Sequence, residues 1–232
     1  MSFTYFVTAA DWGRIAPELV LTAIALLVML VDLFLPRAGG SSPIYRGRRD
    51  SGPSNYLVLP SLSLLGLVGA LVATIVLFIA GDQQNAFNQM IGSDQGSLYA
   101  YIVILSASTL GILLSPGYLR RINIPHQGEY YALMLFATIG MMLMAAATSF
   151  LTVFLGLEML SLALYILCGF VTRRQTSQEA GMKYFLLSSF ASAFLLYGIA
   201  LAYGATGNTS FIGIRNFLAG PGGLCAHQPR TH

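Results

Sequence analysis

The sequence SFLTVFLGLEMLSLALYILCGFVTRRQTSQEAGMKYFLLSSFASAFLLYGIALAYG, from Ser149 to Gly204, decides the fold. It consists of two long apolar runs joined by a short turn that carries Arg173 and Arg174. Each run contains one ionisable residue in its interior, Glu158 in the first and Lys183 in the second. Because a charged side chain at the centre of a bilayer costs about 3 kcal/mol or more, these two residues require an explanation.

The composition of the whole chain is that of an integral membrane protein. Of its 232 residues, 56% are hydrophobic and 9% are charged, and the mean hydropathy is +0.70. Soluble domains contain about 25% charged residues. The net charge of +3 comes from Arg residues at or beyond the ends of apolar runs, so membrane topology explains it and no nucleic-acid partner is expected.

Six apolar runs are long enough to cross a hydrocarbon core of about 30 Å at about 1.5 Å per residue. They cover residues 15–35, 57–80, 98–114, 131–147, 150–171 and 180–204. None alternates with the period of two that a membrane strand requires. We therefore predict an all-α polytopic membrane protein with six transmembrane helices in residues 1–210. A polar tail, residues 211–232, is rich in Gly and Pro and cannot span.

Basic residues predict the orientation of these helices. The second and fourth connections contain neither Lys nor Arg, whereas the first, third and fifth do. Because cytoplasmic connections are enriched in basic residues, this alternation places the N-terminus and the tail on the outer side. The residues concerned are Arg37, Arg46, Arg48, Arg49, Arg120, Arg121, Arg173 and Arg174.

Three acidic residues lie within the predicted spans at different depths. Glu18 and Asp32 are near the two ends of the first span, where we expect water or lipid headgroups to reach them. Glu158 is about nine residues into its span and therefore lies near the membrane midplane. Its carboxyl group must face protein or water, and it either exchanges protons or hydrogen-bonds a neighbouring helix as a neutral acid.

Lys183 is the single lysine of the chain and lies about one turn inside the sixth span. It can extend its ammonium group to the membrane surface, or it can relay protons, because an ammonium group can lose its proton and a guanidinium group cannot. Along antiparallel helices its depth differs from that of Glu158 by roughly 10–15 Å at about 1.5 Å per residue. Direct contact between the two is therefore not expected.

No other motif in the sequence indicates chemistry. There is no nucleophile constellation, no phosphate-binding glycine motif and no set of redox-cofactor ligands. Cys168 and Cys225 have neither disulfide nor metal-ligand spacing, and the Met residues of 134–144 have no His or Cys beside them. We expect no metal and no cofactor on this chain.

The segments GEYYALMLFATIGMMLM (128–144), FLTVFLGLEMLS (150–161) and EAGMKYFLLSSFASAFLLYGIALAYGATG (179–207) resemble subunit N of bacterial NADH:quinone oxidoreductase, respiratory complex I. Weaker similarity runs through PELVLTAIALLVMLVDLF (17–34) and QMIGSD (89–94). The FLGLE motif is shared by all antiporter-like subunits of this complex. The run MKYFLLSSFASAFLLYGIALAYG resembles subunit N more than subunits L and M or the Mrp-type sodium/proton antiporters.

This resemblance implies a membrane-arm subunit that couples quinone reduction elsewhere in the complex to proton translocation. Glu158 corresponds to the family's glutamate of the fifth helix and Lys183 to the lysine of the sixth. The chain itself would bind no cofactor, while the whole complex uses NADH and quinone. The other membrane subunits of complex I and the lipid bilayer would be its partners, in the bacterial inner membrane.

The resemblance ends near residue 210, and about fourteen helices in two inverted repeats are expected in the family. We therefore interpret the chain as the N-terminal part of a subunit N, truncated before the broken helix whose lysine partners the glutamate. Two alternatives remain. One is a non-pumping membrane scaffold or assembly fragment, and the other is a subunit of an Mrp-type cation/proton antiporter.

Overall fold

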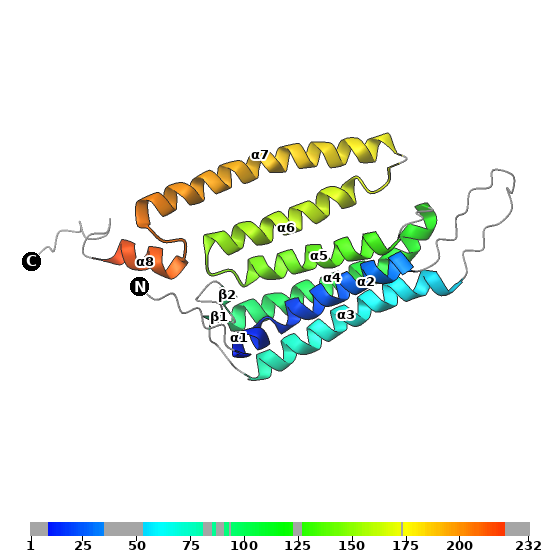
Figure 1. Cartoon of the computed structure of the whole chain (residues 1–232), viewed down its shortest axis with the longest axis horizontal. Coiled ribbons are helices and arrows are strands. Elements are labelled where there is room, and N and C mark those ends of the chain that lie inside the picture. Colours follow the sequence, from blue (N-terminus) through cyan, green and yellow to red (C-terminus); the bar gives the residue numbers. More distant parts are fainter. Residues whose placement is uncertain are drawn as a thin grey trace, which may run out of the picture.

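The computed structural model describes residues 9–34, 53–80, 85–86, 91–92, 94–122, 127–172 and 174–220. Within this part the chain is a bundle of long helices that run alternately up and down (Figure 1). The elements are α1 (Ala9–Arg14), α2 (Ala16–Phe34), α3 (Pro53–Ala80), β1 (Asn85–Ala86), β2 (Ile91–Gly92), α4 (Gln95–Ile122), α5 (Gln127–Ala145), α6 (Phe150–Cys168), α7 (Gln175–Thr206) and α8 (Phe211–Ala219).

Six helices of the described part are long and apolar enough to cross a membrane, which confirms the predicted all-α architecture. Four of these helices extend beyond their predicted bounds: α3 begins four residues earlier, at Pro53, α5 begins four residues earlier, at Gln127, and α4 and α7 are longer at both ends. The helix α4 continues through Pro116 to Ile122, although a proline removes one backbone hydrogen bond and often kinks a helix. The helix α7 includes the polar residues from Gln175 onward. In contrast, α5 and α6 end slightly earlier than predicted, at Ala145 and Cys168.

The core of the molecule forms where α2, α3, α4 and α5 pack together. On α2, Leu21, Ala25 and Val28 are fully buried, at the spacing of three and four residues that marks one helix face. A glycine of α3 contributes to this contact: a Cβ atom on Gly66 would lie 2.5 Å from Ile24. Glycine therefore permits the close approach of α2 and α3.

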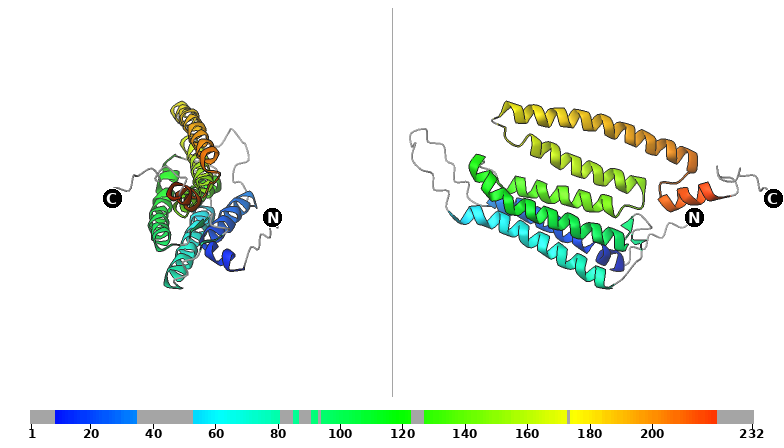
Figure 2. Two further views of the ribbon diagram at one scale, coloured as in Figure 1. Left: turned by 90° about the vertical axis from the view of Figure 1, so that its left-hand side faces the viewer. Right: turned by 180° about the vertical axis from the view of Figure 1, so that it is seen from behind.

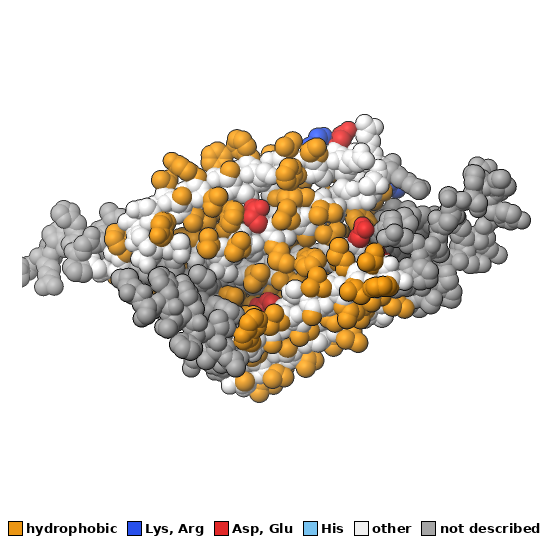
Figure 3. Space-filling view, viewed as in Figure 1, with side chains coloured by type: hydrophobic (Ala, Val, Ile, Leu, Met, Phe, Trp, Pro, Cys, Tyr) orange, Lys and Arg blue, Asp and Glu red, His pale blue; other side chains and the backbone are white. Residues whose placement is uncertain are grey.

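The helices α5, α6 and α7 form a row on one side of this core, in chain order, with α7 outermost (Figures 1 and 2). Hydrophobic side chains cover much of the visible face of the bundle (Figure 3). On α7 the exposed residues include Phe190, Phe194 and Tyr197. A surface of this kind suits lipid or another membrane helix.

All three predicted basic connections join helices at one end of the bundle. The helices α2, α4 and α6 end there, and α3, α5 and α7 begin there (Figure 1). Arg174 directly precedes α7 at this end. The other basic residues of the first and fifth connections, Arg37, Arg46, Arg48, Arg49 and Arg173, lie outside the described residues.

At the opposite end, the turn between α5 and α6 is held by backbone hydrogen bonds on two sides. The amide of Gly92 in β2 donates to the carbonyl of Ala146 over 2.8 Å. On the other side, the amide of Phe150 donates to the carbonyl of Thr209, which lies between α7 and α8. The amide of Phe211, the first residue of α8, donates to the carbonyl of Thr148, and each of these bonds is 3.1 Å long. These bonds fix the start of α6, which Ser149 also caps through its side chain.

The expected polar tail begins with a helix. The nine residues of α8, FIGIRNFLA, are too few to span a membrane, as predicted, but they continue the apolar pattern beyond residue 210. The ring of Phe211 packs edge-on against Phe150, with centroids 4.9 Å apart. The structure therefore corrects the description of this segment as uniformly polar. Residues 221–232, including Cys225, lie outside the described residues.

Candidate functional site

Glu158 is the ninth of the nineteen residues of α6 and therefore lies at its centre. We therefore expect it near the membrane midplane. Its side chain is half-buried. The hydroxyl of Ser192 on α7 donates a hydrogen bond to its Oε1 atom, and Ser192 itself is 9% exposed. The carboxyl group is thus directed between α6 and α7.

The backbone beside Glu158 is fixed by a close crossing of α5 and α6. A Cβ atom on Gly156 would lie 2.9 Å from the backbone nitrogen of Met144, and one on Gly140 would lie 2.7 Å from that of Leu160. Real Cβ atoms do not approach backbone so closely, so glycine is required at both positions. Two residues before Glu158, α6 is therefore held against α5.

A second contact between α6 and α7 lies two turns beyond Glu158. The hydroxyl of Tyr165 donates to Oγ of Ser188 over 2.8 Å. The ring of Tyr165 also packs edge-on against Tyr184 and Phe185, with centroids 5.0 and 5.5 Å away. Together with the Glu158–Ser192 bond, this contact sets the register of α6 against α7.

Lys183 lies on the exposed side of α7, near the basic end of the bundle. Its Nζ atom is 3.4 Å from Oε2 of Glu179, one turn earlier, and its side chain is 79% exposed. An ion pair of this kind at helix spacing contributes about 0.3–0.5 kcal/mol when exposed. The pair keeps Lys183 beside an acidic group on its own helix.

The structure does not bring Glu158 and Lys183 together. Ser192, which hydrogen-bonds Glu158, follows Lys183 by nine residues on α7. Nine residues correspond to about 14 Å along a helix. The two ionisable groups therefore have separate partners, Ser192 and Glu179.

Neither Ser192 nor Tyr165 was predicted as a neighbour of the site. Ser188 and Ser192 lie one turn apart on α7. The signal was their spacing of four residues on the helix that follows Glu158, because hydroxyl groups one turn apart face the same neighbour. Which of the serines faces the acid follows from the register, which the sequence alone does not define.

A second polar seam runs along α4, on the other side of the bundle. Tyr101, Ser108 and Ser115 recur every seven residues on its buried face. The oxygen of Ser108 accepts from Thr138 on α5 over 2.9 Å, and Ser115 donates to the hydroxyl of Tyr130 over 3.3 Å. Such hydrogen bonds join helices in the absence of water.

The first member of this seam contacts Glu18 on α2. The Tyr101 hydroxyl donates to Oε1 of Glu18, whose residue exposure is only 6%. The prediction that water or headgroups reach Glu18 is therefore wrong. Packing of α2 against α3 and α5 and the contact with Tyr101 of α4 close the site, and these helices are far apart in the sequence. Asp32 at the other end of α2 lies against Gly128 at the start of α5.

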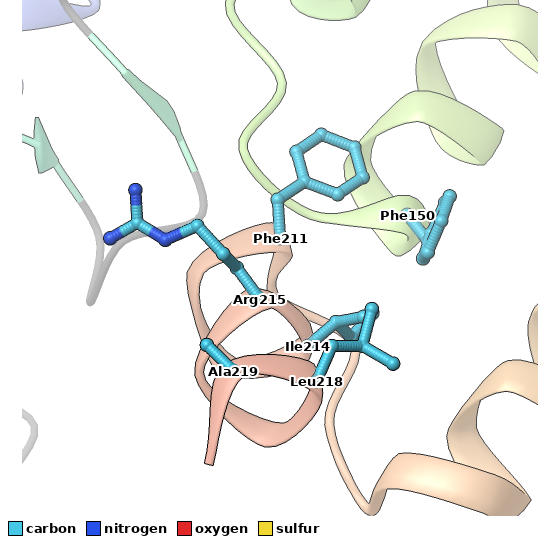
Figure 4. A pocket seen from close by; sticks show the side chains of 6 residues that line it. All are labelled: Phe150, Phe211, Ile214, Arg215, Leu218 and Ala219. Atoms are coloured by element: carbon cyan, nitrogen blue, oxygen red, sulfur yellow. The ribbon is translucent and has the colours of Figure 1, made fainter. Parts of the chain in front are cut away.

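The described residues contain no group of three or more His, Cys, Asp or Glu side chains that could hold a metal ion. They do form a hollow of about 570 Å³ between α8 and the start of α6. Its lining is apolar apart from Arg215, whose side chain points away from Phe150 (Figure 4). No carboxyl, thiol or imidazole group lines it, so Glu158 remains the candidate site. The lining consists of Phe150, Phe211, Ile214, Arg215, Leu218 and Ala219.

Comparison with known proteins identifies relatives of this fold. Residues 147–228 match the family described as NADH:quinone oxidoreductase/Mrp antiporter, TM. This match includes both Glu158 and Lys183. It also extends past residue 210, so it gives no support to a family boundary there.

Curated relatives match over most of the chain. NADH-quinone oxidoreductase subunit N of Trichlorobacter lovleyi is 40% identical over 90% of this chain and 39% of its own length. Subunit N 1 of Sorangium cellulosum is 38% identical over 93% of this chain and 42% of its own. The chain thus spans about two fifths of the length of these relatives. The predicted resemblance to subunit N is confirmed.

Two solved structures have a similar fold. A chain of respiratory complex I from Thermus thermophilus with bound aureothin matches with a TM-score of 0.65 and 28% identity, over 90% of this chain and 39% of that chain. A chain of an archaeal membrane-bound sulfane sulfur reductase matches with a TM-score of 0.63 and 19% identity, over 85% of this chain and 39% of that chain. The second match supports the fold alone.

Proposed function

We propose that this chain, which resembles complex I subunit N over nine tenths of its length, is a membrane-arm component of a proton-translocating NADH:quinone oxidoreductase. Glu158 would bind and release a transported proton. The observation that carries this proposal is the position of its carboxyl group, at the centre of α6 and hydrogen-bonded by Ser192 of α7, within the segment that matches the family. An acid at this depth is costly, and proton transfer is a use that accounts for this cost.

Lys183 would serve as a separate proton-relay station near the basic end of α7. Its ammonium group is exposed beside Glu179, so it can exchange protons without leaving its helix. The distance of about 14 Å along the helices requires water or other side chains between Lys183 and Glu158.

The chain would bind no redox cofactor, and NADH and quinone would react elsewhere in the complex. Its partners would be the other membrane subunits of complex I and the lipid of the bacterial inner membrane. The exposed apolar surface of α7 is available to both. The N-terminus and residues 211–232 would face the outer side, since the basic connections all belong to the other end of the bundle.

The test uses membrane vesicles from cells that carry the wild-type chain or a variant at its chromosomal locus. Glu158→Gln keeps the shape and hydrogen bonding of the side chain but cannot exchange a proton. We expect NADH-driven proton uptake to fall by about 100-fold, the lower range for loss of a proton-transferring group. Glu129→Gln is the matched control, because Glu129 is an exposed carboxylate in the first turn of α5. Equal uptake in both variants and the wild type would reject the proposal.

The Glu158–Ser192 hydrogen bond also supports a second candidate, a membrane scaffold in which the acid only joins α6 to α7. In that case Glu158→Gln would change helix association and leave proton uptake unaltered. The Mrp part of the family description supports a third candidate, a cation/proton antiporter subunit. It predicts proton movement that depends on sodium and does not depend on NADH.

A further inference from the structure

The buried contact between Glu18 and Tyr101 is separate from the site around Glu158. Glu18 belongs to the first turn of α2, and Tyr101 is two turns into α4. Their residue exposures are 6% and 3%, so neither side chain meets bulk water or lipid. The Tyr101 hydroxyl donates to Oε1 of Glu18.

The second carboxyl oxygen of Glu18, Oε2, is buried and has no hydrogen-bond partner among the described residues. An ionised carboxylate can accept about four hydrogen bonds, and one that is buried requires several of them or a cation. Tyr101 supplies one. A neutral carboxylic acid fits this environment better, because its carbonyl oxygen accepts the single bond from Tyr101 and its other oxygen carries the proton.

The helices packed against α2 place few charges near this contact. The helix α3 contains no Asp, Glu, Lys, Arg or His residue. The single carboxylate of α5, Glu129, and the arginines of α4 belong to the opposite end of the bundle (Figure 1). At the same end are Asp94, which is exposed before α4, and Arg14, which ends α1. The start of α2 favours negative charge, but the carboxyl group is turned towards Tyr101 on α4.

We propose that Glu18 and Tyr101 form a second proton-binding site of this chain, in which Glu18 holds a proton on Oε2 at neutral pH. The ligand is the proton itself, and Tyr101 positions the acid by donating to its carbonyl oxygen. The site joins α2 to α4, so the state of the proton is linked to the packing of these two helices. This proposal does not depend on a role of Glu158 in transport.

Infrared spectroscopy of the full chain in lipid membranes at neutral pH tests the proposal. The difference between the wild type and Glu18→Gln isolates the absorption of this one side chain. We expect the variant to lose a carboxylic acid carbonyl band that shifts in D₂O. Loss of a carboxylate band in its place would overturn the proposal, because Glu18 would then be ionised.

A second variant keeps the proposal testable if Glu18→Gln does not fold. Tyr101→Phe removes the donor to the carbonyl oxygen, so the acid band should move to higher frequency while the acid remains. If Tyr101→Phe does not shift the acid band, this band does not arise from Glu18, and the proposal is also overturned.

Two controls define the result. Glu129→Gln removes an exposed carboxylate and should cost a carboxylate band without affecting the acid band. Arg14→Gln should leave the acid band unchanged, since the proposed site needs no cation. If Arg14→Gln converts a carboxylate band into an acid band, Glu18 was one half of an ion pair and the proposal is wrong.

Discussion

Glu158 and Lys183 occupy different environments, although the sequence presents them as a pair of intramembrane charges. Glu158 is directed into the contact between α6 and α7, where Ser192 binds it. Lys183 is exposed and held by Glu179 on its own helix. The depth of Glu158 follows from its position in the apolar run and could be predicted. Its partner could not, because the register of two helices depends on their packing.

A substitution at Lys183 separates proton relay from a purely electrostatic role. Lys183→Arg preserves the positive charge and the pair with Glu179 but prevents loss of the proton. If Lys183 relays protons, NADH-driven uptake in vesicles should fall by at least about tenfold, since a relay group must change its protonation state. In the control Glu179→Gln, which removes the pair and keeps the ammonium group, uptake should stay near that of the wild type. If uptake with Lys183→Arg is normal, Lys183 does not relay protons and has a role only at the membrane interface.

At the scale of the helices, the close crossing of α5 and α6 positions Glu158. Small residues also form contacts on α3 and α7, at Gly66 and Ser192. The pair Gly140 and Gly156 was not singled out. Each is an isolated glycine in a long apolar helix, and only the structure shows that both lie at one crossing point.

Gly156→Ala tests this crossing. An added methyl group would lie 2.9 Å from the backbone of Met144, which can yield only if the helices separate. We expect a loss of about 1–3 kcal/mol, as for other overpacked sites. Gly198→Ala on α7 is the matched control, because nothing lies within 4 Å of its Cβ position. Thermal unfolding of the purified chain in detergent compares the two, and equal stability would contradict the close crossing.

For the whole molecule, six long apolar runs predicted six spans, and the structure contains six in its described part. The length of an apolar run and the charge of a loop are local properties that can be read directly from the sequence. The burial of Glu18 is not local, because it depends on Tyr101, 83 residues later in the chain. The helix α8 was missed because the glycines and proline after residue 219 dominated the interpretation of the tail.

The predicted orientation can be measured with a membrane-impermeant thiol reagent. Cysteine is introduced at one end of the bundle with Asn208→Cys and at the other with Gln175→Cys, both exposed positions, after Cys168 and Cys225 are replaced by serine. Intact cells should label the first variant, and the second should react only after the membrane is opened. The reverse labelling pattern would show that the chain has the opposite orientation in the membrane.

Proton uptake per NADH oxidised, measured in vesicles that carry Glu158→Asp or Glu158→Gln, is the most direct test of the role of this acid. Aspartate retains a proton-exchanging group with shorter reach, whereas glutamine retains the size and hydrogen bonding without the acid. We expect the Asp variant to keep measurable uptake and the Gln variant to lose it, by about 100-fold. Equal uptake per NADH in the Gln variant and the wild type would contradict a proton-carrying role for Glu158.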